Sequence, residues 1–238
     1  MKKAHFLKIV QHRAARVAVT ASATRGQGAD VVDCARDFLV GLKLARFGTH
    51  DPRGFARLLD ADTERLRACL PKRAARWGLA RKLLNIFLRD SLYTSYLARQ
   101  YGLVAAERLL EVPLDSITAK RIRREAPALA LALPRWRGVR HLDPDRSAAY
   151  QEAALVIARQ RGIARVHLDA DWWGARKSEE AMPTAGGKAA STRRRRAAGR
   201  KAAVTRKRRA AGRKAAVTRR RRAAGRKAAA KSQTKARR

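Results

Sequence analysis

The sequence predicts an all-α domain followed by a disordered polybasic tail. Apolar residues recur at helical spacing over 31–160, and no stretch shows the alternating pattern of a strand. The final part of the chain lacks the large apolar residues that a folded core needs. We therefore divide the chain into a basic N-terminal segment at 1–29, an all-α helical domain at 30–177, a linker at 178–187 and a tail at 188–238.

The helical domain is expected to be a bundle around one central helix. The stretch 83–97 is apolar on nearly every side, which is typical of a helix in the middle of a bundle. Asp62 or Thr63 is expected to cap a short helix that ends before Pro71. The remaining helices are expected at 31–42, 53–59, 104–110, 116–125 and 147–160.

Three polar side chains interrupt the apolar character of this central helix. Lys82, Asn85 and Arg89 are spaced so that they share one helix face within about 60°. A polar face on an otherwise buried helix points either to solvent or into a cleft. The spacing alone leaves both interpretations open.

The charge of the chain indicates a polyanionic partner. The 238 residues include 57 Lys+Arg and 19 Asp+Glu, a formal net charge of +38. Residues 188–238 contain 23 basic residues and no acidic ones. Their 13-residue repeats begin at Arg193, Arg206 and Arg219, and this period is too short for a solenoid unit. The tail resembles those of linker histones and bacterial histone-like proteins, which implies nucleic-acid binding.

Two motifs in the helical domain resemble the helix-hairpin-helix DNA glycosylase superfamily. The run GLARKLLN at 78–85 is similar to the hairpin of that superfamily and the lysine that opens its next helix. The run VPLDS at 112–116 is similar to the Pro-apolar-Asp at the start of a later helix. Asp115 follows Lys82 by 33 positions, a separation closest to that of the archaeal 8-oxoguanine glycosylase branch. An extra helical segment intervenes there, for which residues 101–111 are available.

The resemblance implies that Lys82 is the nucleophile and Asp115 the carboxylate of a base-excision site. A lysine attacks C1′ of the sugar only as the free amine, which burial or cationic neighbours such as Arg81 and Arg89 favour. The carboxylate stabilises the cationic sugar or helps to deprotonate the nucleophile. Asp115 also precedes an amphipathic run, as a helix N-cap does, and the two roles are compatible.

Contacts with nucleic acid are expected from basic side chains in both parts of the chain. In the helical domain they are Arg81, Arg89, Lys120, Arg121, Arg123 and Arg124. In the tail they are Arg193, Arg194, Arg195, Arg196, Arg206, Lys207, Arg208, Arg209, Arg219, Arg220, Arg221 and Arg222. A flipped-out base would lie in an apolar or aromatic pocket, for which Trp77, Tyr93 and Trp136 are candidates.

The function expected from the sequence is DNA binding, with base excision of the glycosylase or lyase type as the activity. A non-enzymatic, chromosome-associated architectural protein and an RNA-associated factor are the alternatives. His167, Asp169 and Asp171 alternate without a partner motif, so neither a metal nor a cofactor is expected. No apolar run reaches the length of a membrane helix, so we expect duplex DNA rather than a membrane as partner, in the cytoplasm at the nucleoid.

Overall fold

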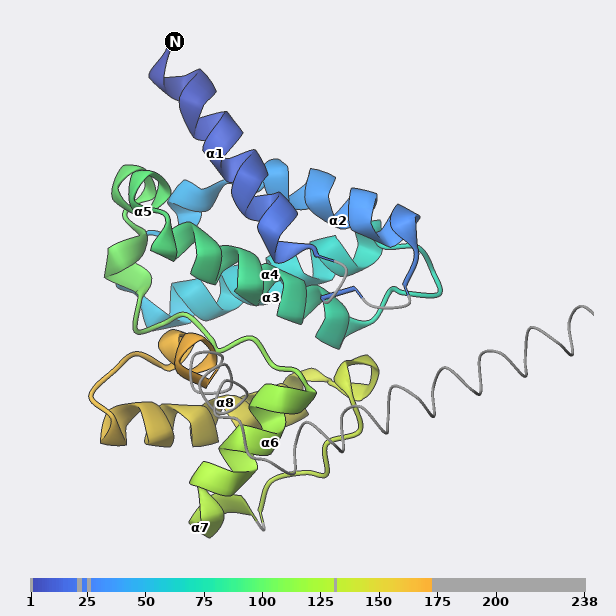
Figure 1. Ribbon diagram of the computed structural model, residues 1–238, viewed down its shortest axis with the longest axis vertical. Helices are drawn as coiled ribbons and strands as arrows, with labels where there is room; N and C mark the ends of the chain where they lie inside the picture. The colour runs from blue at the N-terminus through green and yellow to red at the C-terminus, as the bar shows by residue number, and fades with distance from the viewer. Residues whose placement is uncertain (1, 21–22, 25–26, 131, 173–238) are drawn as a thin grey trace, which may run out of the picture. The chain divides into compact units, whose positions relative to one another are not determined.

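The computed structural model describes residues 2–20, 23–24, 27–130 and 132–172 (Figure 1). Every regular element within these residues is a helix and no strand occurs among them, which confirms the all-α prediction. None of the helices in this part of the chain is long and apolar enough to cross a membrane. The linker predicted at 178–187 and the tail lie outside the described residues.

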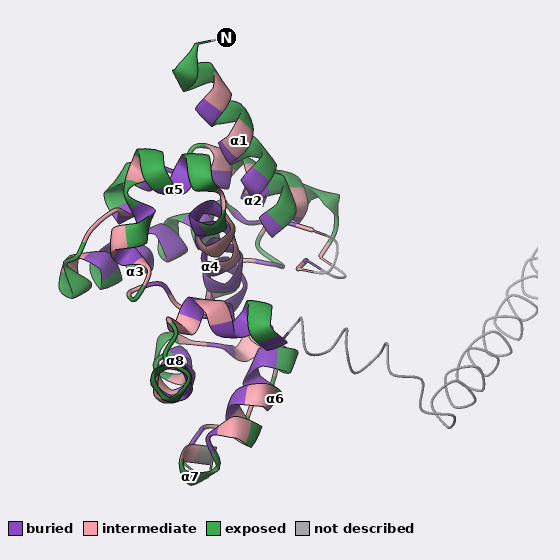
Figure 2. Cartoon of the chain, turned by 60° about the vertical axis from the view of Figure 1, so that its left-hand side comes forward, coloured by how far each residue is buried: buried purple, intermediate pink, exposed green. Residues whose placement is uncertain are grey.

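The first lobe is built by the helices up to residue 106. They are α1 (Lys3–Ala18), α2 (Ala29–Val40), α3 (Pro52–Cys69), α4 (Trp77–Tyr93) and α5 (Ser95–Tyr101), with 3-10 helices at Leu44–Phe47 and Leu103–Ala106. Helices α1 and α3 both pack on α4, which is buried along most of its length (Figure 2). Leu83, Leu84 and Phe87 have no exposed surface. The apolar α4 is therefore the centre of this lobe, as its sequence predicts.

Several predicted boundaries within the first lobe are wrong. Residues 52–69 form one continuous helix, so Asp62 and Thr63 lie inside α3 and cap nothing. Both are buried, and the Thr63 hydroxyl donates to the carbonyl of Leu59 at 2.7 Å. The predicted central helix at 83–97 begins earlier, at Trp77, and is interrupted at Thr94, whose backbone is extended.

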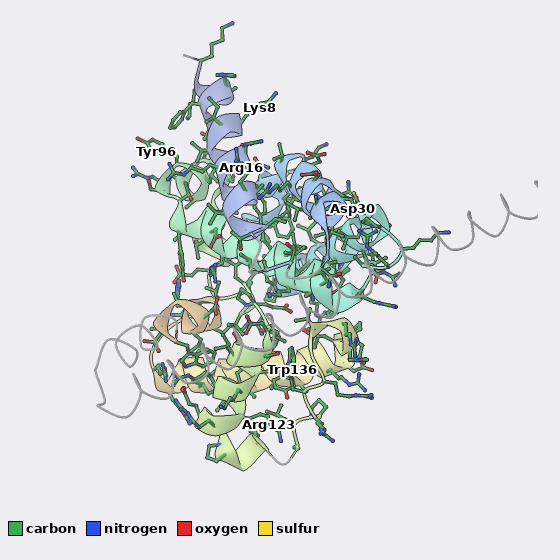
Figure 3. All side chains as sticks on the ribbon, turned by 45° about the vertical axis from the view of Figure 1, so that its right-hand side comes forward. Lys8, Arg16, Asp30, Tyr96, Arg123 and Trp136 are labelled. Atoms are coloured by element: carbon green, nitrogen blue, oxygen red, sulfur yellow. The ribbon has the colours of Figure 1, made fainter. Side chains whose placement is uncertain are left out.

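The N-terminal segment contributes to the core instead of standing apart from it. Helix α1 buries Leu7, Ala14, Ala15 and Ala18 against the rest of the first lobe. Its basic side chains, Lys8 and Arg16 among them, are exposed on the other side of the helix (Figure 3). A helix with one apolar stripe and one basic face accounts for both the charge and the burial.

The second lobe contains α6 (Ser116–Glu125), α7 (Pro127–Ala130) and α8 (Pro144–Gln160). Two 3-10 helices, Val139–His141 and Arg165–His167, and a helical segment at 168–172 complete it. Tyr150 and Trp172 are its largest buried side chains. Its core is a separate cluster from that of the first lobe, except that Val166 of the Arg165–His167 helix is buried in the first-lobe cluster.

The two lobes are joined at the start of α4 and along the irregular segment at 110–115 that precedes α6. A Cβ atom on Gly78 would lie 2.2 Å from the carbonyl oxygen of Val139, so only glycine permits this approach. Gln151 of α8 accepts from the amide of Val112 at 3.2 Å and donates to its carbonyl at 2.8 Å. The Gly78 approach holds α4 against the second lobe, and the Gln151 bonds, within the second lobe, place the chain that leads to Asp115.

Candidate active site

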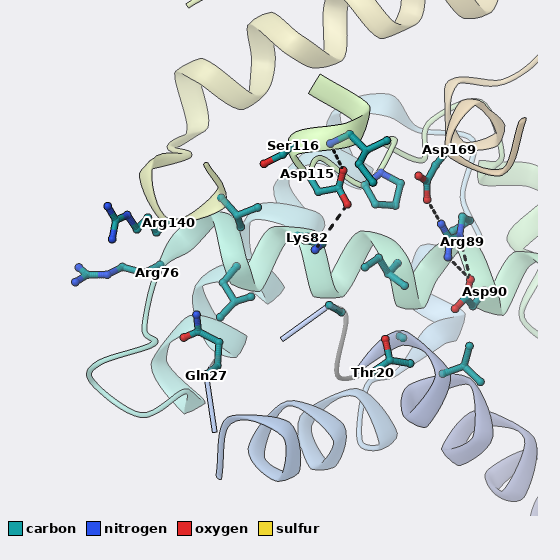
Figure 4. A pocket seen from close by; sticks show the side chains of 18 of the residues that line it. Thr20, Gln27, Arg76, Lys82, Arg89, Asp90, Asp115, Ser116, Arg140 and Asp169 are labelled. Atoms are coloured by element: carbon teal, nitrogen blue, oxygen red, sulfur yellow. Dashed lines mark hydrogen bonds and ion pairs between the residues drawn. The ribbon is translucent and has the colours of Figure 1, made fainter. Parts of the chain in front are cut away.

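A cavity of about 780 Å³ lies between the two lobes (Figure 4). Its walls come from the end of α1 and the following loop, from α4, from the chain at the start of α6, and from the 3-10 helix Val139–His141. The titratable side chains that line it are Arg73, Arg76, Lys82, Arg89, Asp90, Asp115, Arg140 and Asp169. Its apolar walls are provided by Val17, Ala18, Ala23, Leu79, Ile86, Pro113, Ile117 and Val139. A cavity of this size and mixed character is typical of a site for a small molecule or a nucleotide.

Lys82 reaches the cavity from the buried helix α4. The residue is only 9% exposed, and its neighbours Leu83 and Leu84 belong to the core of the first lobe. Ile86, one turn further along, lines the same cavity. The Lys82 amine is therefore held on a rigid element beside an apolar wall, with Asp115 as the carboxylate partner that faces it across the cavity.

The two oxygens of the Asp115 carboxylate make different contacts. Oδ1 accepts from the amides of Ile117 and Thr118 at 2.8 and 3.0 Å, which makes Asp115 the N-cap of α6. Oδ2 lies 4.0 Å from Nζ of Lys82. The structure thus brings the two predicted catalytic residues together, and the N-cap interpretation of Asp115 holds at the same time.

One end of the cavity is occupied by a cation between two carboxylates. Arg89 pairs with Asp90 at 2.8 Å and with Asp169, whose contact is also direct. Burial raises the pKa of Asp169 to about 6, and the nearby Asp115 and Asp90 add to the shift, while Arg89 and Lys82 oppose it. Burial also raises the pKa of Asp90. Because Arg89 is engaged by both carboxylates, it is less available to a phosphate than the sequence predicts.

The opposite end of the cavity is cationic (Figure 4). Arg76 lies just before α4, and Arg140 lies on the 3-10 helix Val139–His141. Both side chains are exposed. Arg73, also in the lining, is instead paired with Asp30 and donates to the carbonyl of Gln27 at 3.1 Å.

Arg81 and Asn85 do not reach the cavity. The Arg81 guanidinium is buried and binds Glu111 at 2.9 Å, Asp60 at 2.8 Å and the Thr63 hydroxyl at 3.0 Å. Asn85 donates to the same Glu111 carboxylate at 2.9 Å. Arg81 is therefore engaged by carboxylates away from the cavity, and its contact with nucleic acid stays a prediction. The predicted polar face splits: Lys82 and Arg89 line the cavity, whereas Asn85 lies with Arg81.

The basic residues of α6 lie away from the cavity lining. Arg123 donates to the carbonyls of Leu133 and Pro134 at 3.0 and 3.4 Å, so it supports the loop that follows α7. Lys120 and Arg124 are exposed, and Arg121 is half-buried. The predicted tail contacts, Arg193–Arg196, Arg206–Arg209 and Arg219–Arg222, lie outside the described residues.

The predicted aromatic wall is also absent from the residues that line the cavity. Trp77 packs under the Arg81 guanidinium at 5.0 Å. Tyr93 stacks on His167, and Trp136 packs edge-on against Tyr150. All three therefore support the fold, and the side walls of the cavity are aliphatic.

The three alternating residues His167, Asp169 and Asp171 each contact a side chain of opposite type. His167 contacts Glu107 at 2.8 Å, and Asp171 pairs with Arg161. No group of three or more potential metal ligands occurs in the part of the chain that the structure describes. Asp169 instead lines the cavity. The alternating spacing of the sequence does not predict this position.

Comparison of the chain with models of protein families, with curated proteins and with solved structures gives no significant match.

Proposed function

We propose that the protein binds DNA and excises bases at the cavity between the lobes, with Lys82 as nucleophile and Asp115 as its carboxylate partner. The observation that supports this most directly is the 4.0 Å approach of the Lys82 amine to Asp115 Oδ2 inside a cavity of nucleotide size. An amine on a rigid, buried helix beside a carboxylate is the pair that imine-forming base excision requires.

The chemistry that this pair supports is a displacement at C1′ of the sugar. The Lys82 nitrogen forms a bond to C1′ as the N-glycosidic bond breaks, and the bonding electrons leave with the base, which takes a proton from water. Asp115 accepts the proton that the attacking amine gives up and stabilises positive charge on the sugar. The nitrogen lone pair then forms a second bond to C1′ as the C1′–O4′ bond breaks, and O4′ takes the proton that Asp115 accepted. The nitrogen and C1′ remain joined as a protonated imine.

The polycationic tail provides non-specific affinity in this proposal. Phosphate contacts from arginine and lysine hold a protein on DNA without reading its sequence, whereas a cavity that accepts one nucleotide provides selectivity. The two parts of the chain therefore have separable roles.

Borohydride trapping tests the proposal directly. The full-length protein is incubated with duplexes that contain 8-oxoguanine, uracil or an abasic site, and with an undamaged duplex. At least one modified duplex should yield a covalent adduct whose position, located by mass spectrometry of peptides, is Lys82. Lys82→Gln should abolish that adduct and leave affinity for the duplex nearly unchanged.

Lys43→Gln is the matched control, because it removes an exposed lysine that is neither part of the cavity nor a predicted contact with nucleic acid. Its adduct yield should equal that of the unchanged protein. Adducts that persist in Lys82→Gln at the same rate, or that map only to the lysines of the tail, would favour the non-enzymatic, architectural function instead.

A further inference from the structure

The cationic end of the cavity carries charge that its surroundings do not neutralise. Arg89, Arg81 and Arg73 are each paired with carboxylates. Arg76 and Arg140, in contrast, form no ion pair with any carboxylate in the described residues. The Arg140 Nε lies 2.9 Å from Nε2 of His141. Both guanidinium groups extend in the same direction, away from Lys82 and Asp115 (Figure 4).

The neighbouring imidazole of His141 lies among several cations. Desolvation lowers the pKa of His141, and repulsion by Arg140, Arg137, Arg146 and Arg76 lowers it further. Four cations therefore act on one surface group. A potential of this sign attracts a phosphate and repels a cationic ligand.

The backbone holds the two arginines in a fixed relation. The Arg76 carbonyl accepts from the amides of Leu79 and Ala80, both at 3.1 Å, so Arg76 is tied to the first turn of α4. Gly78 in that turn would, with a Cβ, lie 2.2 Å from the carbonyl of Val139, the residue before Arg140. The close packing of these two segments fixes the backbone positions of Arg76 and Arg140 at the same rim of the cavity.

We propose that Arg76 and Arg140 form a phosphodiester-binding site that holds the backbone next to the nucleotide that enters the cavity. This inference rests on the proposed function, because it gives that site a DNA strand as its ligand. Two guanidiniums on one rim can bind the non-bridging oxygens of a phosphate through charge-assisted hydrogen bonds. The aliphatic cavity then needs no aromatic stacking to position the nucleotide, since its backbone is held at the rim.

The salt dependence of binding tests this site. Full-length protein, Arg76→Gln/Arg140→Gln and the control Arg53→Gln/Arg57→Gln are titrated with a duplex that contains an abasic-site analogue. The control removes the same charge from exposed arginines of α3 that are not part of the cavity. Each lost phosphate contact should reduce the slope of log K against log salt by about 0.9. We expect a reduction of about 1 to 2 for the rim variant and none for the control.

Equal reductions in both variants would mean that Arg76 and Arg140 act only as diffuse surface charge, and the absence of a reduction in the rim variant would mean that they contact no phosphate. Either result would overturn the site. Because the assay measures binding and needs no covalent adduct, it gives the same answer whether or not Lys82 reacts. Failure of the base-excision proposal and failure of the rim site are therefore distinguishable.

Chemical modification distinguishes a DNA phosphate from a small anion. Phenylglyoxal reacts with accessible guanidiniums, and peptide mapping gives the extent at Arg76 and Arg140 separately from the tail. The abasic duplex should protect both residues several-fold more than it protects Arg53. If inorganic phosphate at the same phosphate concentration protected them equally well, the assignment to a nucleic-acid backbone would be wrong.

Discussion

At the scale of single residues, Asp115 combines a helix cap and a cavity-facing oxygen in one carboxylate. Asparagine keeps the oxygen that accepts from Ile117 and Thr118 but replaces the negative charge opposite Lys82. We expect Asp115→Asn to slow trapping strongly while it changes the free energy of unfolding by less than about 0.5 kcal/mol. Asp115→Ala removes the cap as well and should cost about 1 kcal/mol.

Urea denaturation and single-turnover trapping of the two variants check this prediction. The Asn and Ala variants should share the loss of rate and differ in stability. A rate that falls only in proportion to stability would mean that Asp115 acts solely as a cap.

Asp169 provides a prediction on pH. Its pKa is raised from 3.8 to about 6, mainly by burial, so the folded state holds its proton more tightly than the unfolded chain does. The stability that this proton contributes is complete below about pH 4 and is lost as pH rises to about 6. For a shift of about two units, the loss approaches about 2–3 kcal/mol.

Asp169→Asn removes this titration. The free energy of unfolding of the variant should therefore depend less on pH between about 4 and 6 than that of the unchanged protein. Denaturation curves across this range measure the difference. Parallel curves for the two proteins would show that Asp169 titrates at an ordinary pKa.

The sequence predicts the two central residues of the site but not their surroundings. Lys82 and Asp115 belong to short sequence motifs, and such motifs can be recognised without knowledge of the fold. Arg81 and Lys82 are adjacent cations, yet only Lys82 lines the cavity. Arg81 is instead bound by Asp60 and Glu111, which are distant in the sequence. Arg76 and Arg140 lie outside long helices, so no periodicity marks them. Their role depends on tertiary contacts that a linear pattern does not contain.

At the scale of elements, the central position of α4 can be tested by truncating its core. Phe87 has no exposed surface and lies within the main cluster of the first lobe. Phe87→Ala should reduce the free energy of unfolding by about 3–5 kcal/mol, because it removes apolar contacts and leaves a cavity. Val104→Ala, at a residue that is 59% exposed, is the control and should change it by less than about 0.5 kcal/mol.

Chemical denaturation of both variants gives the comparison. A small change at Phe87 would place α4 near the surface, contrary to its observed burial.

Helix class follows from the sequence more reliably than helix ends do. The apolar spacing over α4 and α8 predicts helices at the observed places. Asp62 and Thr63 favour cap positions in general, yet inside α3 Asp62 pairs with Arg65 at 2.7 Å and Thr63 bonds to the preceding turn. At Thr94 the chain bends without a glycine or proline, and its hydroxyl donates to the Asp90 carbonyl at 2.8 Å. Side-chain bonds of this kind override the capping preference of Asp62 and Thr63 inside α3, and the bend at Thr94 has such a bond too.

At the scale of the whole molecule, the tail and the helical domain should contribute separately to binding. If the tail contacts about 6–10 phosphates, affinity for DNA should fall about 10³–10⁵-fold between 50 and 200 mM salt. A variant that ends at residue 187 should lose most of this dependence, because it lacks the 23 basic residues of 188–238.

Fluorescence anisotropy with a labelled duplex measures the slope, and circular dichroism checks that the helical domain remains folded. The same slope with and without the tail would assign the phosphate contacts to the domain instead.

The buried pair of Arg81 with Glu111 connects the same two segments that carry Lys82 and Asp115. Separating the lobes would break both pairs at once and would leave the Arg81 charge without its Glu111 partner, which is costly in a protein interior. Both pairs therefore oppose a hinge opening of the cavity walls. Under the proposed function, the nucleotide then supplies the movement by rotating out of its helical stack.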